Sequence, residues 1–388
     1  MRDKDIYDYR LNTPFTIDER IDQAAIALNS GTFQIHSPKI RRRDDKLMCF
    51  PAIWEDKLYL RHVNQKLELA YKVRTTNRSS IIKQICSLLK SDAPMRILRT
   101  DVKSFYRSIS IESLITQISR DGFMRYEEMR AIETVLRASQ NGAMKGLPWG
   151  LSISSTLAEI AMQEFDHSVW KIAGLFYYRR FVDDIIAVSP CSAYQLLSQF
   201  ESILPKPLRL GAEKTKETEE IISKTQPHQT SFQYLGYAFE RDLSIKKGKN
   251  IVETRVSIAP SKIERMITRI DLSIARYKED GNLTVLRGRL KMLTGNYYIR
   301  KSGHPDPIPV GIFYNYKFID DVKDLMVLDK HLRGKLVALR IFNRSRGAGQ
   351  ICIKSLFVLS FESGWKDRIS HRFSRDRLNK YRSVWIYG

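Results

Sequence analysis

The stretch Phe176–Val188, which reads FYYRRFVDDIIAV, decides how the rest of the chain is interpreted. Two runs of aromatic and β-branched residues flank a short acidic centre, a pattern that predicts a strand, a tight turn and a second strand. The turn then presents two adjacent carboxylates, Asp183 and Asp184, whose mutual repulsion a divalent cation would relieve. Because acidic pairs also occur as plain turn residues, the meaning of this pair depends on the other motifs.

A second acidic position lies upstream. Arg96–Val102 predicts a strand that carries Asp101 to its end, and Ser110 then caps a helix. The apolar face of that helix consists of Ile111, Leu114, Ile115 and Ile118. If the strand of Asp101 is the antiparallel neighbour of the acidic hairpin, the carboxylates meet and can hold the two metal ions that nucleotidyl transfer uses.

The charge of the chain is high and uneven. The 388 residues have a net charge of +22, of which +5 falls on residues 1–240 and +17 on residues 241–388. On a surface that serves only solubility, basic and acidic residues are interspersed. Positive charge that is gathered in one region instead favours a polyanionic partner, above all a nucleic acid.

Cysteine usage and hydropathy predict a cytoplasmic protein without a membrane span. The four cysteines, at positions 49, 86, 191 and 352, have no metal-ligand spacing, which is typical of free thiols in a reducing compartment. No apolar run is long enough to cross a bilayer, and the first residues do not read as a signal peptide.

The remaining elements are predicted from local signals, and the chain reads as helical from residue 255 onward. The local predictions are a short strand at Leu58–Leu60, a helix after the loop Gly146–Gly150 with Ser154 or Ser155 as its cap, a hairpin over Phe232–Phe239 that bends at Gly236, and a capping box at Ser261–Glu264.

Taken in order, these motifs resemble those of the reverse transcriptases, and within them the bacterial enzymes of the retron, group II intron and phage-defence (abortive-infection) lineages. The resemblance covers residues 40–300. Its motifs are DVKSFY at 101–106, GLPWG at 146–150, FVDD at 181–184, the segment 210–215 with Lys214, and YLGY at 234–237.

The resemblance implies an α+β fold of the right-hand polymerase type, with fingers, an antiparallel-sheet palm and a helical thumb. The expected domains are the fingers and N-terminal region at 1–95, the palm with part of the fingers interleaved at 96–254, and the helical thumb with the basic C-terminal region at 255–388.

The resemblance also implies roles for the motif residues. Asp101 and Asp183 would bind two Mg²⁺ ions, for which Mn²⁺ could substitute, with Asp184 assisting and the Val102 carbonyl as a further ligand. Tyr106 would stand under the sugar of the incoming nucleotide and exclude a 2′-hydroxyl. The nucleotide-binding residues would be Tyr106, Trp149, Gly150 and Lys214.

Nucleic-acid contacts are predicted at three places: a basic run near the start, the YLGY hairpin and the basic tail, which has the aromatic residues Phe373 and Tyr381 among its cations. The residues are Arg41, Arg42, Arg43, Tyr234, Gly236, Arg372, Arg375, Arg377 and Lys380.

Three positions depart from the family pattern. Trp149 stands where glutamine is usual, Glu159 where asparagine is usual, and Phe181 where tyrosine is usual. An indole can stack on a base but cannot make the hydrogen bonds of an amide. Ordinary template use is therefore the feature that these departures call into question.

The function predicted from this resemblance is RNA-directed DNA polymerisation in bacterial antiphage defence. The defence role is an analogy, drawn because 388 residues leave no room for a nuclease, integrase or maturase domain. The alternatives are an untemplated or protein-primed DNA polymerase and a non-catalytic RNA-binding scaffold. Expected partners are dNTPs, a DNA product and an RNA template or structured non-coding RNA, with a homo-oligomer or a second protein encoded nearby left open.

Overall fold

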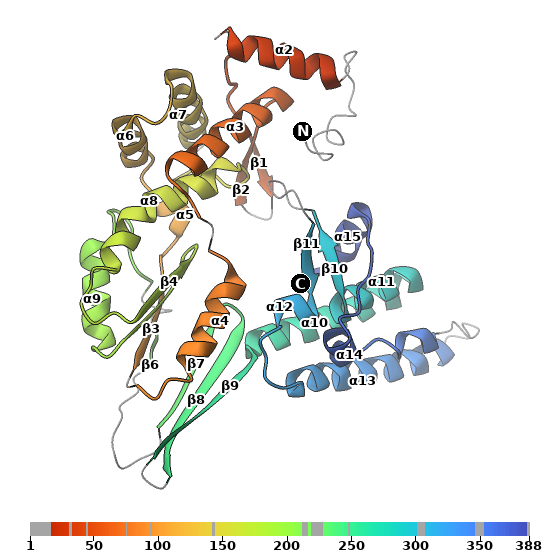
Figure 1. Ribbon diagram of the computed structural model, residues 1–388. Helices are drawn as coiled ribbons and strands as arrows, with labels where there is room; N and C mark the ends of the chain where they lie inside the picture. The colour runs from red at the N-terminus through yellow and green to blue at the C-terminus, as the bar shows by residue number, and fades with distance from the viewer. Residues whose placement is uncertain are drawn as a thin grey trace. The chain divides into compact units, whose positions relative to one another are not determined.

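The structure is a computed structural model, shown in Figure 1. It describes residues 17–345 and 353–385, except for 31–32, 44–45, 75, 94, 142–143, 212–215, 219–227, 247–248 and 301–306. The chain divides into two compact units, Met1–Ile81 with Ala93–Ile221, and Ile82–Asp92 with Ile222–Gly388. Helix α4 (Arg78–Leu88) belongs partly to each.

The first unit is built on a four-stranded antiparallel sheet with the strand order β4-β5-β3-β6. Its strands are β3 (Arg96–Asp101), β4 (Tyr177–Phe181), β5 (Asp184–Ser189) and β6 (Lys216–Thr218). A separate hairpin pairs β1 (Lys39–Arg43) with β2 (Lys46–Phe50). The helices are α2 (Ile17–Asn29), α3 (Trp54–Ala70), α5 (Phe105–Ser108), α6 (Ile111–Asp121), α7 (Tyr126–Asn141), α8 (Ile153–Val169) and α9 (Ala193–Ile203).

The predicted acidic hairpin is confirmed. Strands β4 and β5 pair antiparallel from Tyr177 opposite Val188 to Phe181 opposite Asp184, which leaves a two-residue turn at Val182 and Asp183. The four residues 185–188 are buried almost completely. A continuous apolar run of this kind suits a strand that is covered on both faces.

Helix α6 also forms as predicted. The Ser110 hydroxyl accepts a hydrogen bond from the Ser113 amide, and the four apolar residues expected on one face are the four that are buried. The core of this unit joins α6 and α7 to α8 and the sheet, and α3 packs against α8 (Figure 1).

Two local predictions in the first unit are wrong. Leu58–Leu60 lies inside α3, where Leu60, Val63 and Leu67 are buried at helical spacing, a period that a three-residue window cannot reveal. Ser154 does not cap α8 but lies within it, and its hydroxyl donates to the Pro148 carbonyl at 2.6 Å. Ser155 likewise lies inside the helix, where its hydroxyl bonds the carbonyl of Ser152, the residue at the N-cap position.

The second unit combines a three-stranded antiparallel sheet with helices. The sheet has the order β7-β8-β9. The elements are β7 (His228–Tyr234), β8 (Tyr237–Lys246), β9 (Lys249–Ile258), α10 (Pro260–Asp280), α11 (Leu283–Thr294), β10 (Asn296–Ile299), β11 (Ile308–Gly311), α12 (Ile312–Asn315), α13 (Lys323–Ser345), α14 (Phe361–Lys366), α15 (Arg375–Arg382) and the short 3₁₀ helices Ile353–Leu356 and Ser383–Trp385.

The hairpin predicted over Phe232–Phe239 is confirmed, with its turn at Leu235 and Gly236. Both residues have positive φ, 46° and 86°, which is the signature of a type I′ turn and explains the glycine. The helical character begins later than predicted, because β9 continues to Ile258. The capping box at Ser261–Glu264 is wrong: α10 starts at Pro260, a residue suited to the first helical position.

The α+β prediction is thus confirmed as a mixture of helices and antiparallel sheets. Cys49, Cys86 and Cys191 are free thiols, and Cys352 lies outside the described residues. Within the described part of the chain, no helix combines the length and the hydropathy that a membrane crossing needs.

Candidate active site

The register of the first sheet brings the two acidic positions together. Asp101, at the end of β3, is the direct antiparallel partner of Asp184 at the start of β5. The next amide, that of Val102, donates a hydrogen bond to the Asp183 carbonyl at 3.0 Å. Directly paired residues of an antiparallel ladder have Cα atoms about 4.5–5.5 Å apart. The three acidic residues named from the sequence are therefore neighbours along the backbone of this sheet.

The turn that presents Asp183 has an unusual conformation. Val182 has a φ of 61°, in the left-handed region that β-branched residues rarely adopt. Such a conformation persists only where the surroundings enforce it. The contacts of this turn are therefore part of the site.

Gly211 packs closely against Asp101. The Gly211 amide donates to the Asp101 carbonyl at 2.7 Å. A Cβ atom added to Gly211 would lie only 2.3 Å from Oδ1 of Asp101. In the segment 210–215 the sequence indicated a role only for Lys214, which lies outside the described residues. It did not indicate a role for Gly211. A glycine directly after Leu210 is a weak signal without knowledge of this contact.

The donor set fits a hard divalent cation. Asp101 is buried, at 7% exposure, while Asp183 and Asp184 are half-buried. In the described part of the chain, no group of three or more His, Cys, Asp or Glu residues is arranged so that it could hold a metal ion by itself. Mg²⁺ commonly binds through one or two carboxylates and completes its shell with water and substrate phosphates. The carboxylates here suit that incomplete mode of binding.

Tyr106, on the short helix α5, lies near Asp183 and Glu159. Burial raises the pKa of its phenol, and the negative charges of Glu159 and Asp183 raise it further, with a smaller opposing effect from Arg180. The phenol is therefore uncharged at neutral pH. The ring is half-buried and packs edge-to-face on Phe105, with ring centroids 5.4 Å apart.

The loop Gly146–Gly150 joins Tyr106 to strand β2. The Leu147 amide donates to the Tyr106 carbonyl at 2.7 Å, and the Trp149 carbonyl accepts from the Cys49 amide at 2.7 Å. Gly150 has a φ of 99°, and a Cβ atom there would lie 2.4 Å from the Cys49 carbonyl oxygen. Trp149 is half-buried and Gly150 is exposed.

Sequence reasoning missed the polar cluster behind the acidic turn. The Arg180 guanidinium, only 5% exposed, is ion-paired with both Glu159 and Asp166 of α8. Its Nη1 also donates to the Val182 carbonyl at 2.9 Å. Burial by itself would lower the pKa of Arg180, but the hydrogen bonds and charges of Asp166 and Glu159 outweigh it and raise the pKa above its usual value.

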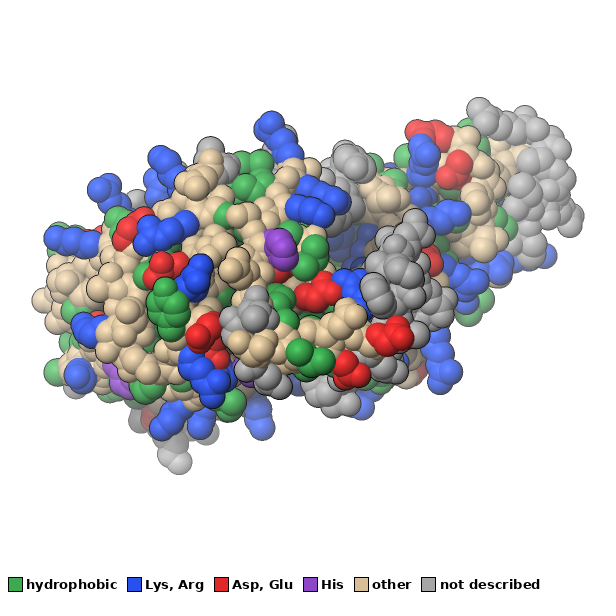
Figure 2. All heavy atoms as spheres, turned by 90° about the horizontal axis from the view of Figure 1, so that it is seen from above, with side chains coloured by type: hydrophobic (Ala, Val, Ile, Leu, Met, Phe, Trp, Pro, Cys, Tyr) green, Lys and Arg blue, Asp and Glu red, His purple; other side chains and the backbone are tan. Residues whose placement is uncertain are grey.

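The predicted nucleic-acid-binding residues lie in both units. In the first unit, Arg41 and Arg42 are exposed on β1, and the side chain of Arg43 lies outside the described part of the chain. In the second unit, the four cations of the tail, Arg372, Arg375, Arg377 and Lys380, are exposed. Basic side chains are widespread on the face shown in Figure 2, with acidic ones among them.

Tyr234 requires a correction. Its side chain is 1% exposed and packs inside the β7-β8-β9 sheet region, so its ring has no surface to offer a nucleic acid. The family resemblance of the YLGY hairpin placed Tyr234 among the nucleic-acid contacts, whereas the period-2 alternation of the strand turns its side chain toward the core. Gly236, in the turn itself, is half-buried.

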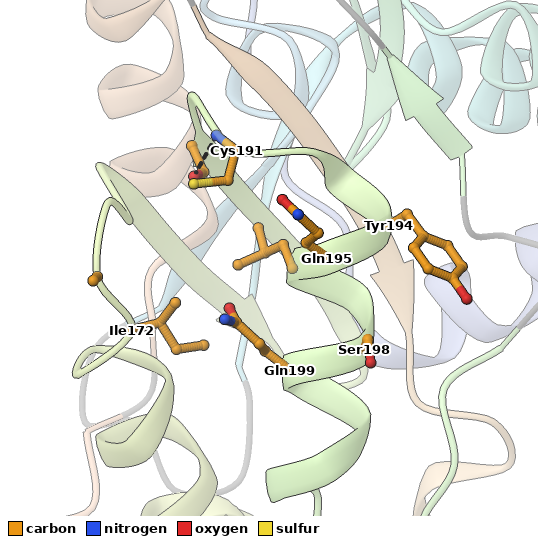
Figure 3. A pocket seen from close by; sticks show the side chains of 9 residues that line it. Ile172, Cys191, Tyr194, Gln195, Ser198 and Gln199 are labelled. Carbon is orange, nitrogen blue, oxygen red and sulfur yellow. Dashed lines mark hydrogen bonds between the residues drawn. The ribbon is translucent and has the colours of Figure 1, made fainter.

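A pocket of about 410 Å³ lies beside α9, and none of the predicted site residues lines it. Figure 3 shows Cys191, Tyr194, Gln195 and Gln199 around it, with the Cys191 amide bonded to the Ser189 hydroxyl. Its lining has no carboxylate and no cation, so it does not have the chemistry of the acidic site.

Comparison with known proteins agrees with the motifs. Residues 51–239 match the family model of the reverse transcriptase (RNA-dependent DNA polymerase). No curated protein matches the chain. The match covers 189 of the 388 residues and indicates a reverse transcriptase domain there.

Among solved structures, telomerase from Candida albicans in complex with a TWJ fragment of telomeric RNA is similar with a TM-score of 0.40 and 13% identity, over 90% of this chain and 61% of that one. Apo telomerase from Candida tropicalis, truncated from its C-terminal domain, is similar with a TM-score of 0.34 and 14% identity, over 56% of this chain and 54% of that one. The chain thus spans less than two thirds of either. The likeness to the reverse transcriptase family is thus shown for residues 51–239.

Proposed function

We propose that this chain synthesises DNA on an RNA template by two-metal nucleotidyl transfer. The observation that carries the proposal is the pairing of Asp101 with Asp184, reinforced by the Val102 amide on the Asp183 carbonyl, inside a reverse transcriptase domain. Asp101 and Asp183 would hold two Mg²⁺ ions, or Mn²⁺ in their place, with Asp184 and the Val102 carbonyl assisting. When bound, such ions stabilise the negative charge that develops during phosphoryl transfer.

The protein's own residues then orient the nucleotide. Tyr106, uncharged and packed edge-to-face on Phe105, would lie under the sugar, where its ring would leave no space for a 2′-hydroxyl. The loop with Trp149 and Gly150 is bonded to the Tyr106 backbone, so it would place the templating base and the nucleotide in register with that ring. Lys214 would donate to the leaving pyrophosphate.

The nucleic acid would be held by charge outside the acidic site. Arg41, Arg42 and Arg43 on β1 and the cations of the tail supply phosphate contacts, with Gly236 allowing close approach at the hairpin turn. The proposed organisation is that of a right-hand polymerase with fingers, palm and thumb and boundaries near residues 96 and 255, and it rests on the resemblance of the motifs.

The finer assignment is to the bacterial reverse transcriptases of phage defence, acting in the cytoplasm on a template or structured RNA. It is supported by the resemblance of the motifs and by the net charge of +17 on residues 241–388. A second copy of the chain or another protein remains a candidate partner.

A second candidate is DNA synthesis without a template or from a protein primer. The observation that favours it is Trp149, whose half-buried indole replaces the amide usual at this position. An indole stacks on a base of any sequence but cannot test its pairing by amide hydrogen bonds.

The experiment is a synthesis assay with purified protein, Mg²⁺ and labelled dNTPs, with and without a defined RNA and annealed primer, followed by sequencing of the product. Product complementary to the supplied RNA supports the first proposal. Homopolymeric or repetitive product that ignores the RNA supports the second. No product with any template or divalent ion contradicts both and favours an RNA-binding scaffold.

A further inference from the structure

Every N–H group of Arg180 has an acceptor. Nε donates to Oδ1 of Asp166 at 3.0 Å, and Nη2 donates to Oδ2 of Asp166 and to Oε2 of Glu159, each at 2.7 Å. Nη1 donates to Oε1 of Glu159 at 3.2 Å and to the Val182 carbonyl at 2.9 Å. A guanidinium has five donors in a fixed plane, so these five bonds fix its position and its orientation.

The two carboxylates come from one rigid support. Glu159 and Asp166 lie on the same side of α8, two turns apart, and the helix is anchored in the core by residues such as Leu157 and Phe165. Asp166 also accepts a hydrogen bond from the Tyr178 hydroxyl at 2.5 Å. The position of Arg180 is therefore set by α8 rather than by the strand that carries it.

Arg180 connects helix α8 to the acidic turn. Its bond to the Val182 carbonyl holds the residue with the left-handed φ, directly before Asp183. The Asp183 carbonyl is held in turn by the Val102 amide of β3. The turn is thus tied on one side to α8 and on the other to the strand of Asp101.

We propose that Arg180, held by Glu159 and Asp166, is a positioning residue that fixes the turn carrying Asp183 so that its carboxylate can share metal ions with Asp101. The inference rests on the function proposed above. It also explains why glutamate occupies position 159: an asparagine has one acceptor oxygen and would leave an N–H of the buried guanidinium without a partner.

The test uses full-length protein with Arg180→Lys, Glu159→Asn and Glu159→Gln. The matched control is Arg179→Lys, the neighbouring arginine, whose guanidinium lies over the rings of Trp170 and Tyr177. Two quantities are measured: the affinity of the protein with bound dNTP for Mn²⁺, by electron paramagnetic resonance, and the Mg²⁺ concentration that gives half-maximal DNA synthesis.

The three variants should weaken Mn²⁺ binding and raise the Mg²⁺ requirement by about 10–100-fold, the usual effect of losing a partner behind a metal ligand. Arg179→Lys should leave both unchanged. Introducing Glu159→Asn into the Arg180→Lys protein should add little, because the two changes break the same cluster. A merely structural role would lower the melting temperature and leave both metal measurements at wild-type values.

The outcomes separate the two proposals. If the wild-type protein neither binds Mn²⁺ with dNTP nor makes DNA, the proposed function fails and this inference with it. If the wild type is active and the folded Glu159→Asn and Arg180→Lys proteins match it in both measurements, the function stands and the positioning role is overturned. Should Arg180→Lys not fold, the two Glu159 variants decide.

Discussion

Gly211 and Asp101 are so close that a Cβ atom on the glycine would lie 2.3 Å from the carboxylate oxygen Oδ1. The backbone of Gly211 lies outside the positive-φ region, so alanine is excluded by the neighbouring carboxylate and not by backbone strain. Because residue 211 has no side chain, the Asp101 carboxylate can occupy its observed position.

Gly211→Ala should reduce DNA synthesis strongly, because the added methyl group displaces the Asp101 carboxylate. Misplacement of a reacting group by about 1 Å can cost about 10²-fold in rate. The matched control is Gly334→Ala on α13, where a Cβ atom meets nothing within 4 Å. That change should leave synthesis intact and stabilise the protein by about 0.5–1 kcal/mol. Full activity of Gly211→Ala would show that the carboxylate has room to move.

Tyr106→Ala should admit ribonucleotides, because it removes the ring that would exclude a 2′-hydroxyl. Discrimination, measured as the ratio of kcat/KM for dNTP and rNTP, should fall at least about tenfold. Tyr106→Phe keeps the ring, and the phenol is uncharged in the wild type, so this variant should discriminate normally. Unchanged discrimination in Tyr106→Ala would move the sugar contact to another residue.

The tail prediction concerns Arg372, Arg375, Arg377 and Lys380, all exposed. Changing the four to glutamine should flatten the dependence of log Kobs for RNA on log salt by up to about 3 units, since each neutralised phosphate contributes about 0.7. The control changes four exposed cations of α13, Lys330, Arg333, Arg340 and Arg344, by the same total charge. Equal flattening in both proteins would show diffuse attraction rather than a site in the tail.

The thiols provide a pH prediction. Burial raises the pKa of Cys49 to about 11, so only about 0.1% of it is thiolate at pH 8, whereas Cys191 is exposed. Iodoacetamide at pH 8 should modify Cys191 and spare Cys49, as read by peptide mass spectrometry. Because the folded pKa exceeds the unfolded value, the stabilisation from Cys49 is complete at neutral pH and is lost as pH rises through about 11. Rapid alkylation of Cys49 in the native protein would contradict its burial.

Predictions from the sequence succeeded where the signal was local. The two aromatic and β-branched runs in 176–188, the cap at Ser110 and the glycine at 236 each specify their element through neighbours along the chain. Leu58–Leu60 failed because three residues cannot distinguish a strand from one turn of α3. The meeting of Asp101 with Asp184 could be stated only as a condition, because strand order and register are not local properties.

The polar cluster was missed for the same physical reason. Arg180 lies beside the acidic turn in sequence, yet its partners Glu159 and Asp166 are on a helix 21 and 14 positions earlier. Nothing in their spacing indicates that two carboxylates of α8 face one arginine of β4 until α8 is packed against the sheet. Glu159 was noticed only as an unusual residue, and the structure supplies its partner.

The most direct test of two-metal DNA synthesis at this site is primer extension on a defined RNA with wild-type protein, Asp183→Asn and the exposed control Asp242→Asn. Asp183→Asn removes the charge that would hold a metal ion and changes the volume very little. We predict that wild type and Asp242→Asn extend the primer with complementary DNA, while Asp183→Asn makes no product and still binds the RNA. Extension by Asp183→Asn at the wild-type rate would contradict the assignment of this carboxylate as a metal ligand.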